Sequence, residues 1–211
     1  MSIIENDVLD SLIATLFARA MQRAGNALSE MSGGVMSVSA PAVQRCSASD
    51  VIEMAGGPDV VSVGIYIGIT GSLDGHGLLL LPLAGARRLA ALLLGEAGQP
   101  AHGRDGSPGV FDDMDLSALQ ELGNVTIGAF LNELATHMHE PVHPTVPQAL
   151  IEFSGSILDA VLADLALESD DEILAARTQF LEGDHEVDGT LLVLPRPNTL
   201  RALLAAVGLV A

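Results

Sequence analysis

The segment 115–134, DLSALQELGNVTIGAFLNEL, combines helical apolar spacing with a cluster of polar side chains. At about 100° per residue, its apolar face consists of Leu116, Leu119, Gly123, Ile127, Phe130 and Leu134. A second face, about a third of a turn away, collects Ser117, Glu121, Asn124 and Gly128. A carboxylate and a carboxamide three residues apart, with a glycine one turn on, form a polar patch that another protein's backbone can approach closely. An ordinary solvated helix face explains the same residues, so the pattern alone leaves both interpretations open.

Two other sets of residues could do chemistry. His137, His139 and His143, with Glu140, could be ligands of a divalent ion, because alternate residues of a strand share a face. They also follow the predicted helix, and histidines commonly complement a helix C-terminus. Cys46 is the single cysteine of the chain and has no activating neighbour in sequence apart from Arg45. We therefore predict neither a metal site nor a nucleophilic cysteine.

Composition excludes several classes of protein. The formal charge is −18 with only nine Lys and Arg residues, which argues against a nucleic-acid partner. Apolar runs are shorter than the roughly 20 residues that cross a bilayer, so we expect no membrane span. The start of the chain carries Glu5, Asp7 and Asp10, unlike the basic start of a secretory signal. Together with the lone cysteine, these features predict a cytoplasmic globular protein.

The two halves of the chain have similar patterns. A shift of 106 residues aligns Ser11 with Ser117, Asn26 with Asn132 and Pro41 with Pro147. Residues 96–114 are rich in Gly and Pro and are predicted to be a linker. We predict one domain over 1–211, made of a first repeat at 8–95 and a second repeat at 115–208.

Each repeat is predicted to run helix, strand, short helix, strand, strand, helix. Alternating or continuous apolar residues predict strands at 61–69, 77–82, 173–181 and 189–195. Short helices are predicted at 47–54 and 156–167, and Gly95 and Gly208 are predicted to end helices. Connections of hairpin length, such as 71–75, favour antiparallel pairing within a mixed α/β (α+β) fold.

The spacing of Ser117, Glu121, Asn124 and Pro147 resembles the signature of the CheC, CheX and FliY family of chemotaxis phosphatases. The sequence ELGN at 121–124 is similar to the EIGN typical of that family. The similarity of architecture extends from about residue 8 to residue 208. This resemblance implies a CheC-like duplicated fold. In such a fold two pseudo-twofold-related halves share a mostly antiparallel six-stranded sheet flanked by helices.

The resemblance also implies an enzyme that hydrolyses the aspartyl phosphate of a CheY-like response-regulator receiver domain. Asn124 would orient the attacking water and Glu121 would contact the receiver's lysine, while Ser117 and Pro147 would support the structure. The chain would need no cofactor of its own, because Mg²⁺ would be bound by the receiver. A CheD-like deamidase is a further expected partner, and the chain could be a monomer or a homodimer.

The first repeat departs from this signature. Ser11 and Pro41 match, but Thr15 and Ala18 stand where the Glu and Asn are expected, so we expect one active site. This loss also keeps an alternative open. The chain could be a non-catalytic relative that binds a receiver, a CheD-like deamidase or a flagellar switch component.

Overall fold

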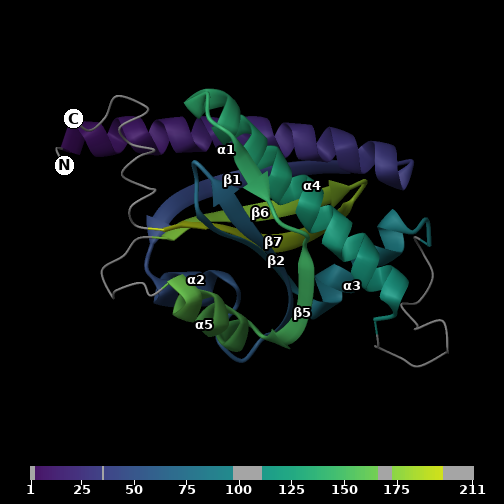
Figure 1. The fold of residues 1–211 in the computed structure, drawn as a ribbon. Helices are drawn as coiled ribbons and strands as arrows, with labels where there is room; N and C mark the ends of the chain where they lie inside the picture. Colours follow the sequence, from purple (N-terminus) through teal and green to yellow (C-terminus); the bar gives the residue numbers. More distant parts are fainter. Residues whose placement is uncertain (1–2, 35, 97–110, 166–172, 197–211) are drawn as a thin grey trace.

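A computed structural model of the chain describes residues 3–34, 36–96, 111–165 and 173–196. Helices and strands alternate along these residues in two similar series (Figure 1). The first series is α1 (Ile3–Ser32), β1 (Met36–Cys46), α2 (Ala48–Met54), β2 (Val61–Gly71), β3 (Gly75–Pro82) and α3 (Leu83–Leu93). The second is α4 (Asp113–Met138), β4 (Val142–Pro144), β5 (Gln148–Phe153), α5 (Ser154–Leu165), β6 (Ile173–Glu182) and β7 (His185–Pro195).

All the described strands belong to one antiparallel sheet with the order β1-β6-β7-β3-β2-β4, and β5 also pairs with β2. Because β4 and β5 pair with different parts of β2, they share one position at the sheet edge. The sheet thus has seven strands in six positions. The order is symmetric about the β7–β3 pair, since β1 pairs with β6 just as β5 pairs with β2. The predicted duplicated α/β fold with a mostly antiparallel six-stranded sheet is confirmed.

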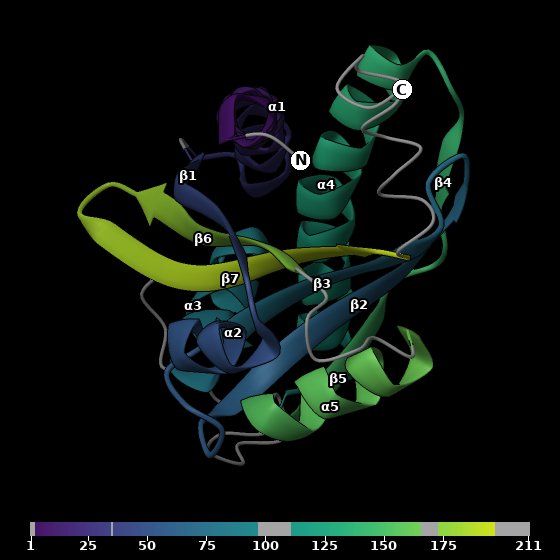
Figure 2. The same ribbon diagram turned by 90° about the vertical axis from the view of Figure 1, so that its left-hand side faces the viewer.

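The two faces of the sheet carry different helices. One core cluster joins α1, α3 and α4 to the inner side chains of the sheet, including Phe17, Ile65 and Phe130. A smaller cluster on the other face joins α2 and α5 to side chains such as Leu78 and Leu192. Figure 2 shows α1 above the sheet, α4 running down behind it, and α2 and α5 below it. This layering is what presents the outward side of α4 to solvent.

The ends of α4 follow from its sequence. Asp112 accepts hydrogen bonds from the backbone amides of Met114 and Asp115 at 2.9 Å, and Asp115 accepts from the Asp112 amide at 3.0 Å. Such a capping box satisfies amides that the first helical turn leaves unpaired. The helix ends at His139, which adopts the left-handed conformation with φ of 55°. The helix therefore begins at acidic residues and ends at one of the histidines that follow the predicted helix.

The other predicted boundaries lie close to the observed ones. α1 begins five residues before residue 8, where the first repeat is predicted to begin, and α5 begins two residues before the short helix predicted at 156–167. Gly95, with φ of +73°, follows α3 as predicted, whereas Gly208 lies outside the described residues. In the described ranges, no helix combines the length and the apolar character that crossing a bilayer requires. The repeat boundaries at 8–95 and 115–208, and the linker between them, remain predictions.

Candidate functional site

Helix α4 lies directly on the sheet through small residues. Gly123 is buried over β2, and a Cβ atom at that position would collide with the side chain of Ile65. One turn on, Ile127 fits over Gly77 of β3, where a Cβ would come within 2.7 Å of its Cγ2 atom. Because these contacts fix the rotation of α4 about its axis, they also fix which side chains face outward.

Glu121 and Asn124 lie together on the outward side of α4. The Asn124 amide Nδ2 donates a hydrogen bond to the Glu121 carboxylate Oε2 at 3.3 Å. Glu121 is exposed and Asn124 is half-buried, so the pair is open to an approaching molecule. Gly128 continues this side of the helix, and a Cβ placed there would meet only open space. The structure thus brings together the carboxylate and the carboxamide that the sequence singled out.

Ser117 and Pro147 lie in different parts of the fold. Ser117 is exposed one turn before Glu121 on α4. Pro147 is half-buried in the gap between β4 and β5, immediately before β5 begins. Pro41, its counterpart in the first repeat, lies in β1 where the register with β6 shifts between Ser39 and Ala42. Proline lacks an N–H for the ladder, so both prolines lie where a strand is interrupted.

The corresponding side of α1 presents different chemistry. Ser11, Thr15 and Ala18 are exposed, and the Thr15 hydroxyl donates to the Ser11 carbonyl oxygen at 2.9 Å. Beside Ala18, a groove of about 330 Å³ separates α1 from β1 and is also lined by Gln22 and Asn26. Among the lining residues that the structure describes, none carries a carboxylate. The Ala18 methyl group cannot orient a water. The Thr15 hydroxyl, which is bonded to its own helix backbone, carries no charge to pair with a lysine.

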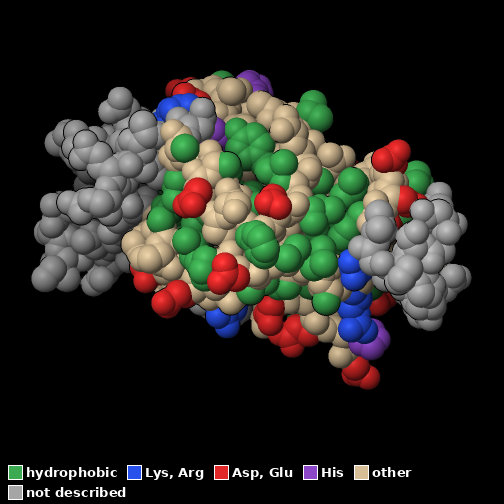
Figure 3. All heavy atoms as spheres, turned by 90° about the horizontal axis from the view of Figure 1, so that it is seen from below, with side chains coloured by type: hydrophobic (Ala, Val, Ile, Leu, Met, Phe, Trp, Pro, Cys, Tyr) green, Lys and Arg blue, Asp and Glu red, His purple; other side chains and the backbone are tan. Residues whose placement is uncertain are grey.

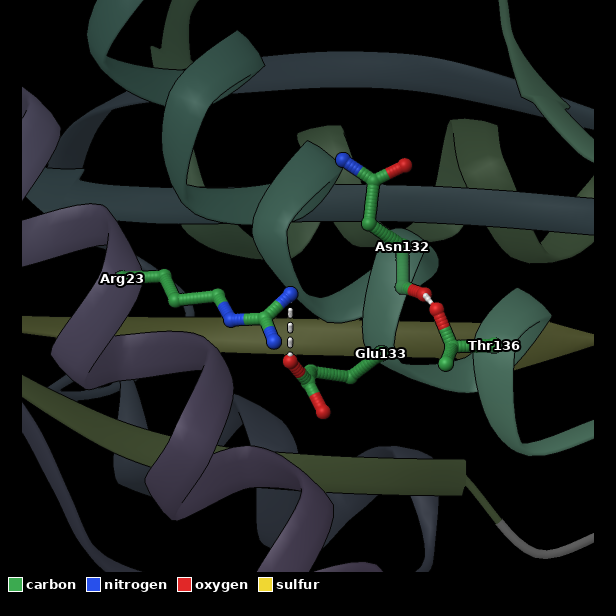
Figure 4. A network of polar contacts seen from close by, with 4 residues as sticks. All are labelled: Arg23, Asn132, Glu133 and Thr136. Carbon is green, nitrogen blue, oxygen red and sulfur yellow. Dashed lines mark hydrogen bonds and ion pairs between the residues drawn. The ribbon is translucent and has the colours of Figure 1, made fainter.

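The contact that holds α4 against α1 could not be predicted from the sequence pattern. Arg23 of α1 reaches the nearly buried Glu133 of α4, with 2.8 Å between Nη1 and Oε1 (Figure 4). The contact pairs opposite charges. It does not have the geometry of a hydrogen bond, and Oε1 accepts none within the described residues. Nearby, the rings of Phe17 and Phe130 pack with centroids 4.1 Å apart. These contacts hold α1 and α4, the leading helices of the two halves, side by side.

The other candidate chemistries find no support. Within the described ranges, His, Cys, Asp and Glu form no group of three or more that could hold a metal ion. His139 ends α4, and Glu140 accepts a hydrogen bond from the Ser72 hydroxyl at 3.1 Å. Burial, with a smaller contribution from Asp50, raises the pKa of the Cys46 thiol to about 11. That thiol is therefore protonated at neutral pH and is a poor nucleophile.

Comparison with known proteins places this fold in a defined class. No family model matches the chain. FliY of Thermotoga maritima superposes with a TM-score of 0.73 at 15% identity over 98% of this chain and 96% of its own. A FliM chain of H. pylori, solved in complex with SpeE, gives 0.65 at 12% identity over 99% of this chain and 96% of that one. CheX of Desulfovibrio desulfuricans gives 0.51 at 16% identity over 86% and 98%. The chain therefore has the fold shared by these FliY, FliM and CheX proteins.

Sequence similarity points in the same direction. The CheY-P phosphatase CheC of Bacillus subtilis is 23% identical over 185 residues, which are 87% of this chain and 86% of that protein. Since the similarity in sequence and the similarity in fold both span most of the chain, the resemblance to the CheC, CheX and FliY family is confirmed.

Proposed function

We propose that this protein is a phosphatase that hydrolyses the aspartyl phosphate of a CheY-like receiver domain. The observation that carries the proposal is the pairing of Glu121 with Asn124 on the open side of α4. The similarity to a CheY-P phosphatase over most of the chain supports the same reaction class.

The proposed reaction is in-line attack of water on the phosphoryl group. The new P–O bond forms to the water oxygen, the bond to the aspartyl oxygen breaks, and the products are the free carboxylate and inorganic phosphate. Such reactions depend mainly on positioning and on neutralising charge. In this proposal the Mg²⁺ that neutralises phosphoryl charge is held by the receiver, and Asn124 positions the water.

The hydrogen bond of the free protein gives each side chain a role. By accepting from Nδ2, Glu121 holds the Asn124 amide and leaves the carbonyl oxygen Oδ1 as an acceptor for the attacking water. The Glu121 carboxylate can exchange this amide for the lysine of a docked receiver, because both are hydrogen-bond donors. Ser117 and Pro147 are assigned no contact with the phosphoryl group.

A second candidate is a binding protein without catalytic activity. Two observations favour it: FliM chains share this fold, including one solved in a FliG–FliM complex, and the first repeat lacks the Glu and Asn. In this case the partner would be a receiver, a CheD-like deamidase or a flagellar switch component. Both functions are compatible with a monomer or a homodimer.

Phosphate release distinguishes the two candidates. Receiver domains from the same genome are charged with acetyl phosphate, and loss of the aspartyl phosphate is followed with and without this protein. Acceleration of at least one receiver, abolished by Asn124→Ala, is the expected result. A wild-type protein that binds a receiver and accelerates the hydrolysis of none supports the binding protein and overturns the phosphatase.

A further inference from the structure

The edge strand β5 exposes an unusual amount of apolar surface. The large hydrophobic side chains that are exposed in the described residues are Met31, Val61, Met114, Val146, Leu150, Ile151 and Phe153. Four of these seven lie within the eight residues 146–153, and Val61 is paired with Phe153 across the ladder. Viewed from below, hydrophobic side chains gather around β5 in the middle of the face (Figure 3). An exposed apolar edge strand promotes aggregation unless a partner covers it.

The strand register separates this surface into two sides. Ile151 pairs with Val63 and Phe153 with Val61, and paired residues point to the same face of a sheet. Val63 lies in the core beneath α1 and α4, so Ile151 and Phe153 face the α4 side. Leu150 pairs with Gly64, over which Ile157 of α5 lies, so Leu150 faces the opposite side. Val61, Ile151 and Phe153 together form an apolar strip on the α4 side.

Asn124 lies on the flank of α4 that faces this strip. Gly123 points to the sheet, and the residues before and after it point to opposite flanks of the helix. The flank of Leu122 is also that of Glu133, which contacts Arg23 of α1. Asn124 is therefore on the side away from α1, and Figure 2 shows the β4–β5 edge of the sheet on that side. The candidate catalytic amide and the apolar strip thus belong to one continuous surface.

We infer that the apolar strip is the second part of the surface on which the receiver docks, with Glu121 and Asn124 forming the polar part. This inference rests on the proposed function. A stable protein interface buries about 800 Å² on each partner, more than one face of one helix supplies, so a docked domain must also cover neighbouring surface. Ala18 lies at the groove between α1 and β1, on the flank of α1 away from α4. The strip, in contrast, adjoins α4 and offers exposed apolar area of the kind that is buried at the centre of interfaces.

The receiver side of this contact can be described chemically. It is an exposed apolar patch beside the acidic pocket that carries the aspartyl phosphate, separated from it by about the width of a helix, roughly 10 Å. In the described residues the strip itself contains no charged side chain, and Glu152 of β5 pairs with Ser62 on the opposite face. Charge on this face therefore comes from α4, where Glu121 meets the receiver's lysine.

The test compares neighbouring positions of one strand. Ile151 is 42% exposed and Leu150 is 41% exposed, so Ile151→Thr and Leu150→Thr remove similar apolar area from opposite faces, and each leaves threonine, which strands favour. Binding is measured against receivers carrying beryllofluoride, and hydrolysis against the same receivers charged with acetyl phosphate. Ile151→Thr is expected to raise the dissociation constant about tenfold, with a smaller effect on the hydrolysis rate at saturation. Leu150→Thr is the matched control and is expected to change the dissociation constant less than twofold.

Other outcomes overturn the inference in distinguishable ways. If the wild type and Ile151→Thr bind the receiver with equal dissociation constants, the strip is not part of the interface, even if Asn124→Ala still abolishes hydrolysis. If Ile151→Thr fails to fold by circular dichroism, Phe153→Thr on the same face replaces it. A wild-type dimer that Ile151→Thr converts to a monomer, with receiver binding unchanged, shows that a second copy of the chain covers the strip. A wild type that binds receivers through the strip and hydrolyses none overturns the proposed function alone.

Discussion

The outward sides of α4 and α1 occupy equivalent positions in the two repeats and present different chemistry. On α4, Glu121 and Asn124 form a hydrogen-bonded polar pair, whereas on α1 Thr15 bonds its own helix backbone and Ala18 offers only a methyl group. The helices, their neighbouring strands and the prolines at the strand interruptions are shared. Because exposed helical side chains contribute little to folding, one repeat can lose a site without loss of the fold. The comparison shows that scaffold and site are separable here.

The largest effect on activity is expected for Asn124→Ala on α4. We expect the rate of receiver dephosphorylation to fall about 100-fold, the scale of losing one positioned hydrogen-bonding group in a catalytic site. The dissociation constant of the receiver should change much less, since the amide acts on the attacking water in the transition state. Single-turnover hydrolysis measures the first quantity and binding to a beryllofluoride-charged receiver measures the second. A wild-type rate for the variant would show that the site is assigned to the wrong residues.

Glu121→Ala is expected to affect both quantities. A carboxylate that contacts the receiver's lysine contributes to docking, so its removal should raise the dissociation constant about tenfold. The same change removes the acceptor that holds the Asn124 amide, so the rate at saturation should fall as well. Glu121→Gln serves as the control, because it keeps the acceptor oxygen and removes the charge. If Glu121→Ala lowers the hydrolysis rate and leaves the dissociation constant unchanged, Glu121 orients the Asn124 amide and does not contribute to docking.

A smaller effect is expected at the contact that joins the two repeats. Arg23→Ala leaves the Glu133 carboxylate, whose side chain is 5% exposed, without its cation. We expect the free energy of unfolding to fall by about 1–2 kcal/mol, below the cost of breaking a fully buried pair because the arginine is itself largely exposed. Denaturant unfolding measures it, with Arg19→Ala on the exposed side of α1 as the control. Equal losses in the two variants would show that the ion pair adds nothing to α1–α4 packing.

Much of this architecture could be predicted from apolar periodicity. The strands at 61–69 and 173–181 alternate or concentrate apolar residues, and both lie inside observed strands. The apolar stripe of α4 is buried at Leu119, Gly123, Ile127, Phe130 and Leu134, whereas Leu116 is half-buried. A helical wheel cannot show that a second helix covers one flank, which is why burial of Leu122, Thr126 and Glu133 was not predicted.

Less of the candidate site than of the fold could be predicted from apolar periodicity and helical spacing. The outward placement of Glu121 followed from helical spacing, but Asn124 is half-buried, because it lies on one flank of α4 and not at its most outward point. The roles of both residues came from the family resemblance and not from the spacing. The apolar strip left no signal in the sequence, since QALIEF looks like a buried strand. Its exposure depends on β5 lying at the sheet edge, which only the topology reveals.

The smallest effect is expected on the outward side of α1, and it tests the comparison from the opposite direction. Thr15→Gln and Ala18→Gln place longer side chains at exposed positions of a long helix, where glutamine is a good helix former and stability should change by about 0.5 kcal/mol or less. If the single site lies on α4, both variants should dephosphorylate the receiver at rates within about twofold of wild type, because no interaction made in the transition state is removed. The measurement is the same single-turnover assay used for Asn124→Ala, with thermal unfolding to show that each variant is folded. A tenfold loss in a folded variant would mean that α1 contacts the receiver, and the groove beside Ala18 would then belong to the docking surface.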